Sequence, residues 1–225
     1  MGGAKRSPPR SCPSTSQGAC LRGEPTPRRI PLSHIFEPDE KFFEILAQID
    51  AAHAREVKVS GCPVCGSPLD CGDYARKPRG ELGEAADAYV TRASFCCRRD
   101  GCRKRATPAS LRFLGRKVYV GAVVVIASAV GRQIRLIGAG TPRRVQGVPV
   151  RTVRRWLDWW STAFVLHRLW SEARAMFATP VAEALLPASL LERFGKPTGA
   201  TLTRLLAFIS PVTTTLDGAR ITIGM

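Results

Sequence analysis

Two pairs of cysteines place the strongest constraint on how this 225-residue chain folds. Cys62 and Cys65 lie in CPVCG, where two intervening residues let a tight turn present both sulfurs to one cation. Cys97 and Cys102 lie in FCCRRDGC, where four intervening residues, including Gly101, allow a second such turn. We therefore expect these four thiolates to bind one structural zinc ion in tetrahedral geometry.

Two further cysteines are alternative ligands, because thirty-one residues separate the two pairs. They are Cys71 and Cys96. If this segment is a strand, Cys96 and Cys97 face opposite sides, so only one can point at the metal, and the tighter spacing to Cys102 favours Cys97. The other interpretation is that the cysteines are buried, reduced thiols. All three histidines lie outside the cysteine segment, which argues against a catalytic zinc with an open position.

Positive charge is concentrated in one quarter of the chain. The formal net charge is +16, and residues 97–155 hold fifteen Lys or Arg against a single acid, Asp100. Such a surface favours an anionic partner, either nucleic acid or an acidic membrane. The longest apolar run, Val118–Val130, has about half the length needed to cross a bilayer as a helix, so we expect no membrane span.

Composition divides the chain into four segments. Residues 1–33 are rich in Pro, Ser, Gly and Arg, which predicts a disordered basic tail without the apolar core of a secretory signal. Residues 34–56 predict a helix, residues 57–117 a zinc ribbon of small hairpins, and residues 118–225 a helical domain. The expected fold is therefore mainly α with a small zinc-ribbon β module, in a cytoplasmic protein associated with the nucleoid. The helices expected after the ribbon span residues 119–131, a short stretch from 142, 150–177, 181–194 and 202–209.

One of these helices, in the segment VPVRTVRRWLDWW, carries a strongly amphipathic pattern. Apolar side chains recur at helical spacing on one face and basic side chains on the other. The apolar set is Val150, Val153, Leu157 and Trp160, and the opposite set is Arg151, Arg154, Arg155 and Asp158. We expect the tryptophans to be core residues and the arginines to meet solvent or phosphate.

The residues upstream predict a second, shorter helix. Thr141 is a suitable N-cap, Pro142 suits the first helical position, and Gly147 can turn the chain. The pattern over residues 141–160 predicts a helix-turn-helix. Two features depart from that motif: the first helix has fewer than two turns, and Pro149 occupies the usual position of a Ser or Thr cap.

The cysteine segment resembles a known class of protein. CPVCG, followed by RASFCCRRDGCRKRATP with Phe113 and Leu114 beyond it, is similar to the N-terminal zinc ribbon of bacterial insertion-sequence-associated, transposase-like proteins. With the following helices, the resemblance covers about residues 57 to 160. It implies binding to transposon ends, or to a transposase or recombinase partner.

A second resemblance concerns the amphipathic helix. The sequence TVRRW is similar to the start of the second helix in bacterial helix-turn-helix segments. The resemblance implies that Arg151, Thr152 and Arg155 read the DNA, while Arg143 and Arg144 contact phosphates.

These observations predict a non-catalytic zinc-ribbon protein that binds the phosphate backbone of DNA, such as an accessory protein of a transposon or insertion sequence. No catalytic residue is assigned, because the acids after the ribbon are scattered over predicted helices. The alternatives are a transposase or nuclease, and an adaptor that binds RNA or protein. The expected DNA contacts are Arg103, Lys104, Arg105, Arg143, Arg144, Arg151, Thr152, Arg154 and Arg155.

Overall fold

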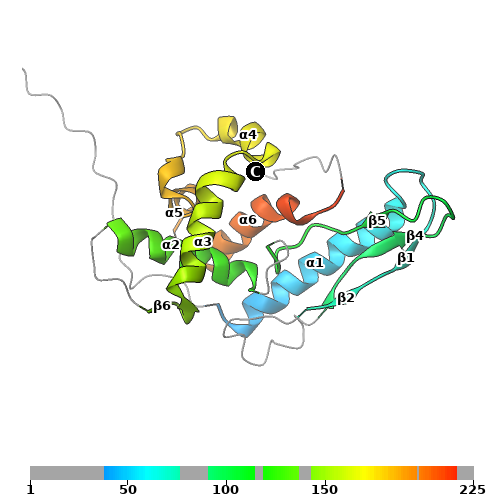
Figure 1. Cartoon of the computed structure of the whole chain (residues 1–225), viewed down its shortest axis with the longest axis horizontal. Helices are drawn as coiled ribbons and strands as arrows, with labels where there is room; N and C mark the ends of the chain where they lie inside the picture. Colours follow the sequence, from blue (N-terminus) through cyan, green and yellow to red (C-terminus); the bar gives the residue numbers. More distant parts are fainter. Residues whose placement is uncertain (1–37, 77–90, 115–118, 137–142, 197, 217–225) are drawn as a thin grey trace, which may run out of the picture. The chain divides into compact units, whose positions relative to one another are not determined.

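The computed structural model describes residues 38–76, 91–114, 119–136, 143–196 and 198–216. All of them belong to one unit, Pro31–Met225. The described chain is mainly helical with small antiparallel sheets, as expected (Figure 1). The predicted disordered tail, residues 1–33, lies outside the described residues.

Helix α1 (Glu40–Ser60) begins at a side-chain cap. The carboxylate of Asp39 accepts a hydrogen bond from the backbone N–H of Phe42 at 2.9 Å, which satisfies one of the free donors of the first turn. The helix runs beyond the predicted end at residue 56. It stops at Gly61, whose φ of +76° is costly for any residue with a Cβ atom.

Helix α1 contributes side chains to two separate hydrophobic cores. Phe42, Phe43 and Leu46 from its first half belong to the large core of the helical body. Ala54 and Val57 from its second half pack against a small core in the cysteine segment. The helix therefore connects the cysteine segment to the helical body.

The cysteine segment forms a three-stranded antiparallel sheet in the order β1-β4-β5. Leu69 pairs with Cys97 and Cys71 with Phe95, so Leu69 and Cys97 lie on one face of the sheet. That face carries the small core, which consists of Cys62, Leu69, Phe95, Cys97 and Ala106. Strands β2 and β3, which lie between β1 and β4 in the sequence, form a separate two-stranded antiparallel ladder. The strand bounds are β1 Leu69–Cys71, β2 Tyr74–Ala75, β3 Thr91–Arg92, β4 Phe95–Cys97 and β5 Arg105–Ala106.

The helical body is built around helices α2 (Gly121–Leu136) and α3 (Val150–Trp159), which pack against each other. Gly131 permits this close approach, because a Cβ atom there would lie 2.7 Å from Cγ1 of Val153. The remaining helices are α4 (Arg168–Ala173), α5 (Ala188–Phe194) and α6 (Gly199–Ile209).

The long helix expected over residues 150–177 is interrupted. After α3 the chain widens into a short π-helix at Trp160–Phe164 and then leaves the helix. His167 then caps α4, its Nδ1 accepting a hydrogen bond from the N–H of Leu169 at 3.1 Å. The last expected helix, residues 202–209, is present within α6.

The residues before α3 form a β-hairpin, so the short helix predicted from residue 142 is wrong for the described residues 143–147. Strands β6 (Arg144–Val145) and β7 (Val148–Pro149) pair antiparallel. Gln146 and Gly147 join them with φ of +49° and +68°, the positive pair that a tight hairpin turn requires. Thr141 and Pro142 lie outside the described residues. The described residues 143–160 therefore do not confirm the predicted helix-turn-helix at residues 141–160.

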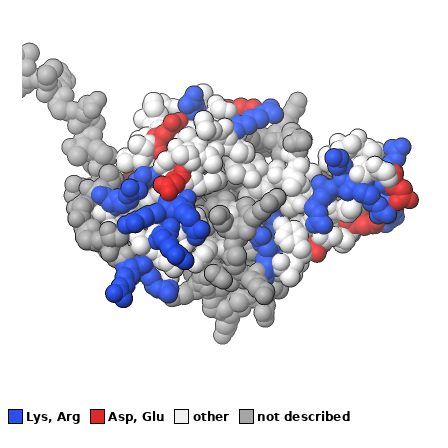
Figure 2. Space-filling view, viewed as in Figure 1, with Lys and Arg blue, Asp and Glu red and all other residues white. Residues whose placement is uncertain are grey.

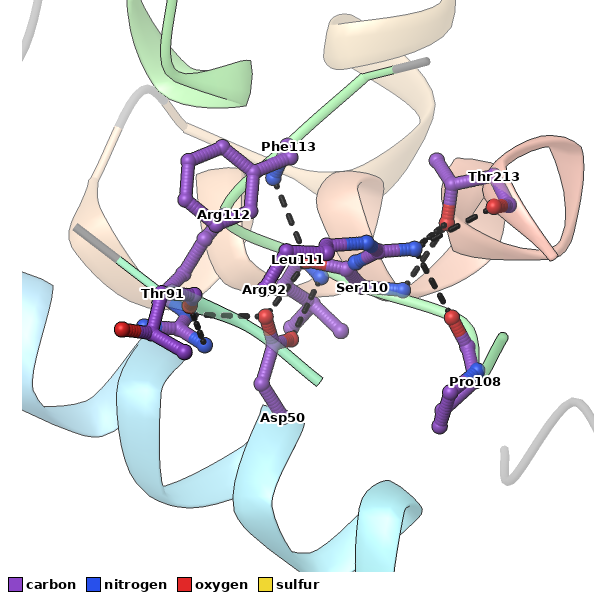
Figure 3. A network of polar contacts seen from close by, with 9 residues as sticks. All are labelled: Asp50, Thr91, Arg92, Pro108, Ser110, Leu111, Arg112, Phe113 and Thr213. Carbon is purple, nitrogen blue, oxygen red and sulfur yellow. Dashed lines mark hydrogen bonds and ion pairs between the residues drawn. The ribbon is translucent and has the colours of Figure 1, made fainter. Parts of the chain in front are cut away.

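A buried polar network joins α1 to the segment that precedes α2 (Figure 3). The carboxylate of Asp50 accepts hydrogen bonds from the hydroxyl of Ser110, from the N–H of Leu111 at 2.7 Å and from Nε of Arg112 at 2.8 Å. Nearby, the guanidinium of Arg92 donates to the carbonyls of Pro108 at 2.8 Å and Thr213 at 3.2 Å. The network ties α1, residues 108–113 and the chain after α6 together.

Candidate metal centre

The first cysteine pair lies in a tight turn directly after α1, which we call the first knuckle (residues 62–67). The carbonyl of Cys62 accepts a hydrogen bond from the N–H of Gly66 at 2.8 Å, and the N–H of Cys62 donates to the carbonyl of Ser67 at 2.9 Å. Gly66 has a φ of +69°, which closes the turn. Both sulfurs of the pair are thereby brought to one side.

The second cysteine pair lies in a loop between β4 and β5, which we call the second knuckle (residues 97–104). The N–H of Cys97 donates to the carbonyl of Lys104 at 2.9 Å, and the N–H of Cys102 donates to the carbonyl of Arg99 at 3.1 Å. Gly101 has a φ of +82°. The loop thus returns Cys102 to the side of the sheet that carries Cys97.

The two knuckles bring the four predicted cysteine sulfurs together, all within 4.8 Å of one another. Sγ of Cys62 lies 3.7 Å from Sγ of Cys102, and Sγ of Cys65 lies 3.5 Å from Sγ of Cys97. A disulfide bond is about 2.05 Å long, so these are separate thiols. Metal–sulfur bonds of about 2.3 Å in a tetrahedron place sulfurs about 3.8 Å apart. The donor set and its dimensions therefore fit one tetrahedral metal ion.

The two alternative cysteines lie outside this cluster. Cys71 is exposed, and its sulfur accepts a hydrogen bond from Nζ of Lys58 at 3.5 Å. Cys96 sits on the opposite face of β4 from Cys97, as strand alternation requires, and its thiol lies 3.6 Å from the carbonyl oxygen of Arg103.

The surroundings of the thiols displace their pKa values in opposite directions. Hydrogen bonds from the side chain and backbone of Ser67 lower the pKa of Cys65 to about 6. Burial raises the pKa of Cys97 to about 12. The backbone N–H of Val64 lowers the pKa of Cys62. Ser67 was not among the predicted site residues, although its position two residues after Cys65 places it within reach of that sulfur.

The second knuckle carries exposed basic side chains that flank the cysteines. Arg103 pairs with Asp100 at 3.0 Å, and Arg105 donates to the hydroxyl of Ser94 at 3.1 Å. Arg99 was not among the predicted contacts, yet it is exposed on the same loop. We call Arg99, Arg103 and Lys104 the knuckle patch.

A second group of basic side chains lies on the β6–β7 hairpin and α3 (Figure 2). All of its members are exposed, and none forms an ion pair with another described residue. We call this group, which consists of Arg143, Arg144, Arg151, Arg154 and Arg155, the helical patch.

Thr152, in contrast, is buried with 8% of its surface exposed, and its hydroxyl accepts a hydrogen bond from Arg155 at 3.4 Å. In this structure Thr152 therefore does not face solvent, and its role in reading DNA stays a prediction. It lies on the apolar face beside Val153 and Trp156, because that face extends further round α3 than the sequence pattern indicated.

Two of the three tryptophans of this segment are core residues, as expected, and Trp159 is half-buried against the same core. Trp156 is 4% exposed and Trp160 fully buried. Tyr119 packs edge-on against Trp156, with ring centroids 5.0 Å apart. Aromatic side chains of α3 thus support the helical patch from beneath.

None of the helices in the described part of the chain has the length and apolar character needed to span a membrane. Comparisons with protein-family models, with curated proteins and with solved structures found no match.

Proposed function

We propose that this protein is a zinc-ribbon protein that binds duplex DNA and serves as an accessory protein of a transposon or insertion sequence. Zinc is the metal that four clustered thiolates at tetrahedral spacing suit best. Cys62, Cys65, Cys97 and Cys102 would hold it, and its role would be to fasten the first knuckle to the second. Because four protein ligands fill a tetrahedral shell, the site leaves no position for a substrate.

The observation that carries DNA binding is the helical patch. Five arginines are exposed on one hairpin and one helix, and Asp158 is the one exposed acid on α3. A surface that only needs solvation normally mixes both signs of charge. Unpaired guanidinium groups in this density attract a polyanion and bind phosphate oxygens through their fork of N–H donors.

The burial of the aromatic side chains supports duplex DNA over single strands. Proteins that hold single strands stack bases on exposed aromatic rings. Of the three tryptophans in and directly after α3, Trp156 and Trp160 are core residues, and Trp159 is half-buried and packs against the same core. The patch offers guanidinium groups at helical spacing instead, which suits the regular phosphates and the groove of a duplex.

Within the helical patch we assign different roles to the hairpin and to α3. Arg151, Arg154 and Arg155 project from the exposed face of a helix, the element that fits the major groove. Arg143 and Arg144 lie at the adjacent hairpin, where Arg144 is positioned by a 2.7 Å hydrogen bond to the carbonyl of Gly147. These two would contact the phosphate backbone.

Support for the mobile-element role comes from the resemblance of the ribbon segment to transposase-like proteins. In that role the DNA would be a transposon end, and a transposase or recombinase would be the protein partner. Among the described residues, the side chains grouped so as to hold a metal are the four cysteines, with no comparable carboxylate cluster. That arrangement favours binding over strand transfer, which uses carboxylates to hold two metal ions.

A competition experiment tests the proposal. The full chain is bound to a fluorescent duplex, and unlabelled duplex, a single strand of the same sequence or a structured RNA is added. We expect the duplex to displace the probe at the lowest concentration. Preferential displacement by RNA would support the adaptor function instead, and displacement by the single strand would contradict the assigned role of the patch.

A further inference from the structure

The two basic surfaces of this protein rest on different supports. The hairpin and α3 are held by Val145, Val148, Val153 and Leu157, which belong to the large core of the helical body. That core contains no cysteine among its described residues. The helical patch therefore has a scaffold that does not involve the metal centre.

The knuckle patch has no such scaffold. Between Cys97 and Cys102 the loop reads RRDG, and RK follows Cys102, so the second knuckle contributes no apolar side chain apart from its cysteines. The small core beneath has five buried members, and Cys62 and Cys97 are two of them. A loop of this composition cannot offset the entropy of ordering by burial alone. Its shape depends on the sulfurs, and hence on a metal that fastens them.

We propose that the metal centre regulates DNA binding by one surface only: metal binding orders the knuckle patch as a second phosphate-contacting surface, whereas the helical patch binds duplex DNA with or without metal. This inference rests on the proposed duplex-DNA function and adds a metal-dependent component to it. The protein would then bind DNA in two modes that differ in the number of phosphates contacted.

The number of phosphate contacts can be measured from salt dependence. Each neutralised phosphate adds about 0.9 to the slope of log affinity against log salt concentration. The knuckle patch holds three cationic side chains, Arg99, Arg103 and Lys104. Removing the metal should therefore lower the slope by about two to three, since the loop no longer presents these charges together.

The chain contains its own control for folding. All four tryptophans lie in α3, the π-helix and α4 of the helical body: Trp156, Trp159, Trp160 and Trp170. Tryptophan emission therefore reports the helical body and not the ribbon. We expect chelation under reducing conditions to leave the emission maximum unchanged while protease cleavage within residues 97–105 increases.

The experiment compares the salt slope of duplex binding, by fluorescence anisotropy, before and after chelation. Its subjects are the parent chain, the variant Arg99→Ala with Lys104→Ala, and Cys62→Ser with Cys65→Ser. We expect chelation to lower the salt slope of the parent chain. The variant Arg99→Ala with Lys104→Ala should already have the lowered slope, and chelation should change it little. The variant Cys62→Ser with Cys65→Ser should behave as the metal-free parent does.

An equal salt slope for the metal-loaded and the metal-free parent chain would overturn this inference and leave the proposed function standing. Loss of all binding on chelation, with a red-shifted tryptophan emission, would also overturn it, because the two supports would not be independent. If the loaded parent does not bind duplex DNA at all, the proposed function itself fails.

Discussion

Asp50 on α1 and Arg112 before α2 form a buried ion pair, with Nε of Arg112 2.8 Å from Oδ2 of Asp50 and the two side chains 5% and 11% exposed. The carboxylate also accepts hydrogen bonds from Ser110 and Leu111. This pair lies at the middle of α1, between the half that enters the large core and the half that packs on the small core of the cysteine segment. It fixes the helix that connects the metal centre to the helical body.

We expect Asp50→Ala to lower the free energy of unfolding by about 3 to 5 kcal/mol, because it removes the buried carboxylate that accepts hydrogen bonds from Ser110, Leu111 and Arg112. Urea denaturation at constant pH and zinc concentration measures the loss. Asp100→Ala is the matched control: its carboxylate also pairs with an arginine, but the side chain is 93% exposed, so no measurable change is expected. Equal midpoints for the two variants would contradict the structural role of Asp50.

Adjacent cysteines provide a test of the metal ligands. Cys97→Ser should abolish stoichiometric zinc binding, because its sulfur belongs to the cluster of four. Cys96→Ser should retain one zinc per chain, since its thiol lies on the other face of β4. Native mass spectrometry of protein purified under reducing conditions gives the stoichiometry. Loss of zinc in the Cys96 variant, with retention in the Cys97 variant, would reverse the ligand assignment.

Zinc affinity should rise with pH. A thiol must lose its proton to bind the metal. Burial raises the pKa of Cys97 to about 12, so at neutral pH this thiol is protonated and releases a proton on binding. Hydrogen bonds from Ser67 lower the pKa of Cys65 to about 6. Cys65 is therefore protonated only below that pH, and only there does it release a further proton when zinc binds. The slope of log affinity against pH should therefore steepen below pH 6.

Competition with a chromophoric chelator of known pH dependence, between about pH 5 and pH 8, measures that slope on either side of the pKa of Cys65. Ser67→Ala is the informative variant. It removes the side-chain hydrogen bond that lowers this pKa most, so the steepening should move to higher pH. An affinity that does not vary with pH would contradict thiolate ligation.

The cysteine cluster could be predicted from sequence because its constraints are local. Pair spacing placed Cys62 beside Cys65, and strand alternation separated Cys96 from Cys97. The hairpin before α3 was missed because Thr141 and Pro142 suggested a helix start. Gly147, which follows Gln146 in the observed hairpin turn, was assigned to a turn between two helices.

Long-range relationships could not be read from the sequence. Asp50 and Arg112 are 62 positions apart, and periodicity gives no means of pairing them. The burial of Thr152 depends on how α3 packs against the rest of the helical body. The helical pattern of the sequence locates the edge of the buried face only to within one residue. Composition placed the positive charge in residues 97–155, and only the fold assigns eight of those fifteen basic residues to two surfaces with different supports.

The central claim, that the helical patch binds duplex DNA, is tested most directly by the salt dependence of affinity in two variants of equal charge. One is Arg151→Ala with Arg154→Ala and Arg155→Ala. The other removes three exposed arginines from α4, α5 and α6: Arg168→Ala, Arg193→Ala and Arg204→Ala. We predict that the first lowers the slope of log affinity against log salt by about two to three, whereas the second leaves it close to that of the parent. Equal slopes in the two variants would show that binding follows net charge alone and would contradict the assignment of α3 as the DNA-binding helix.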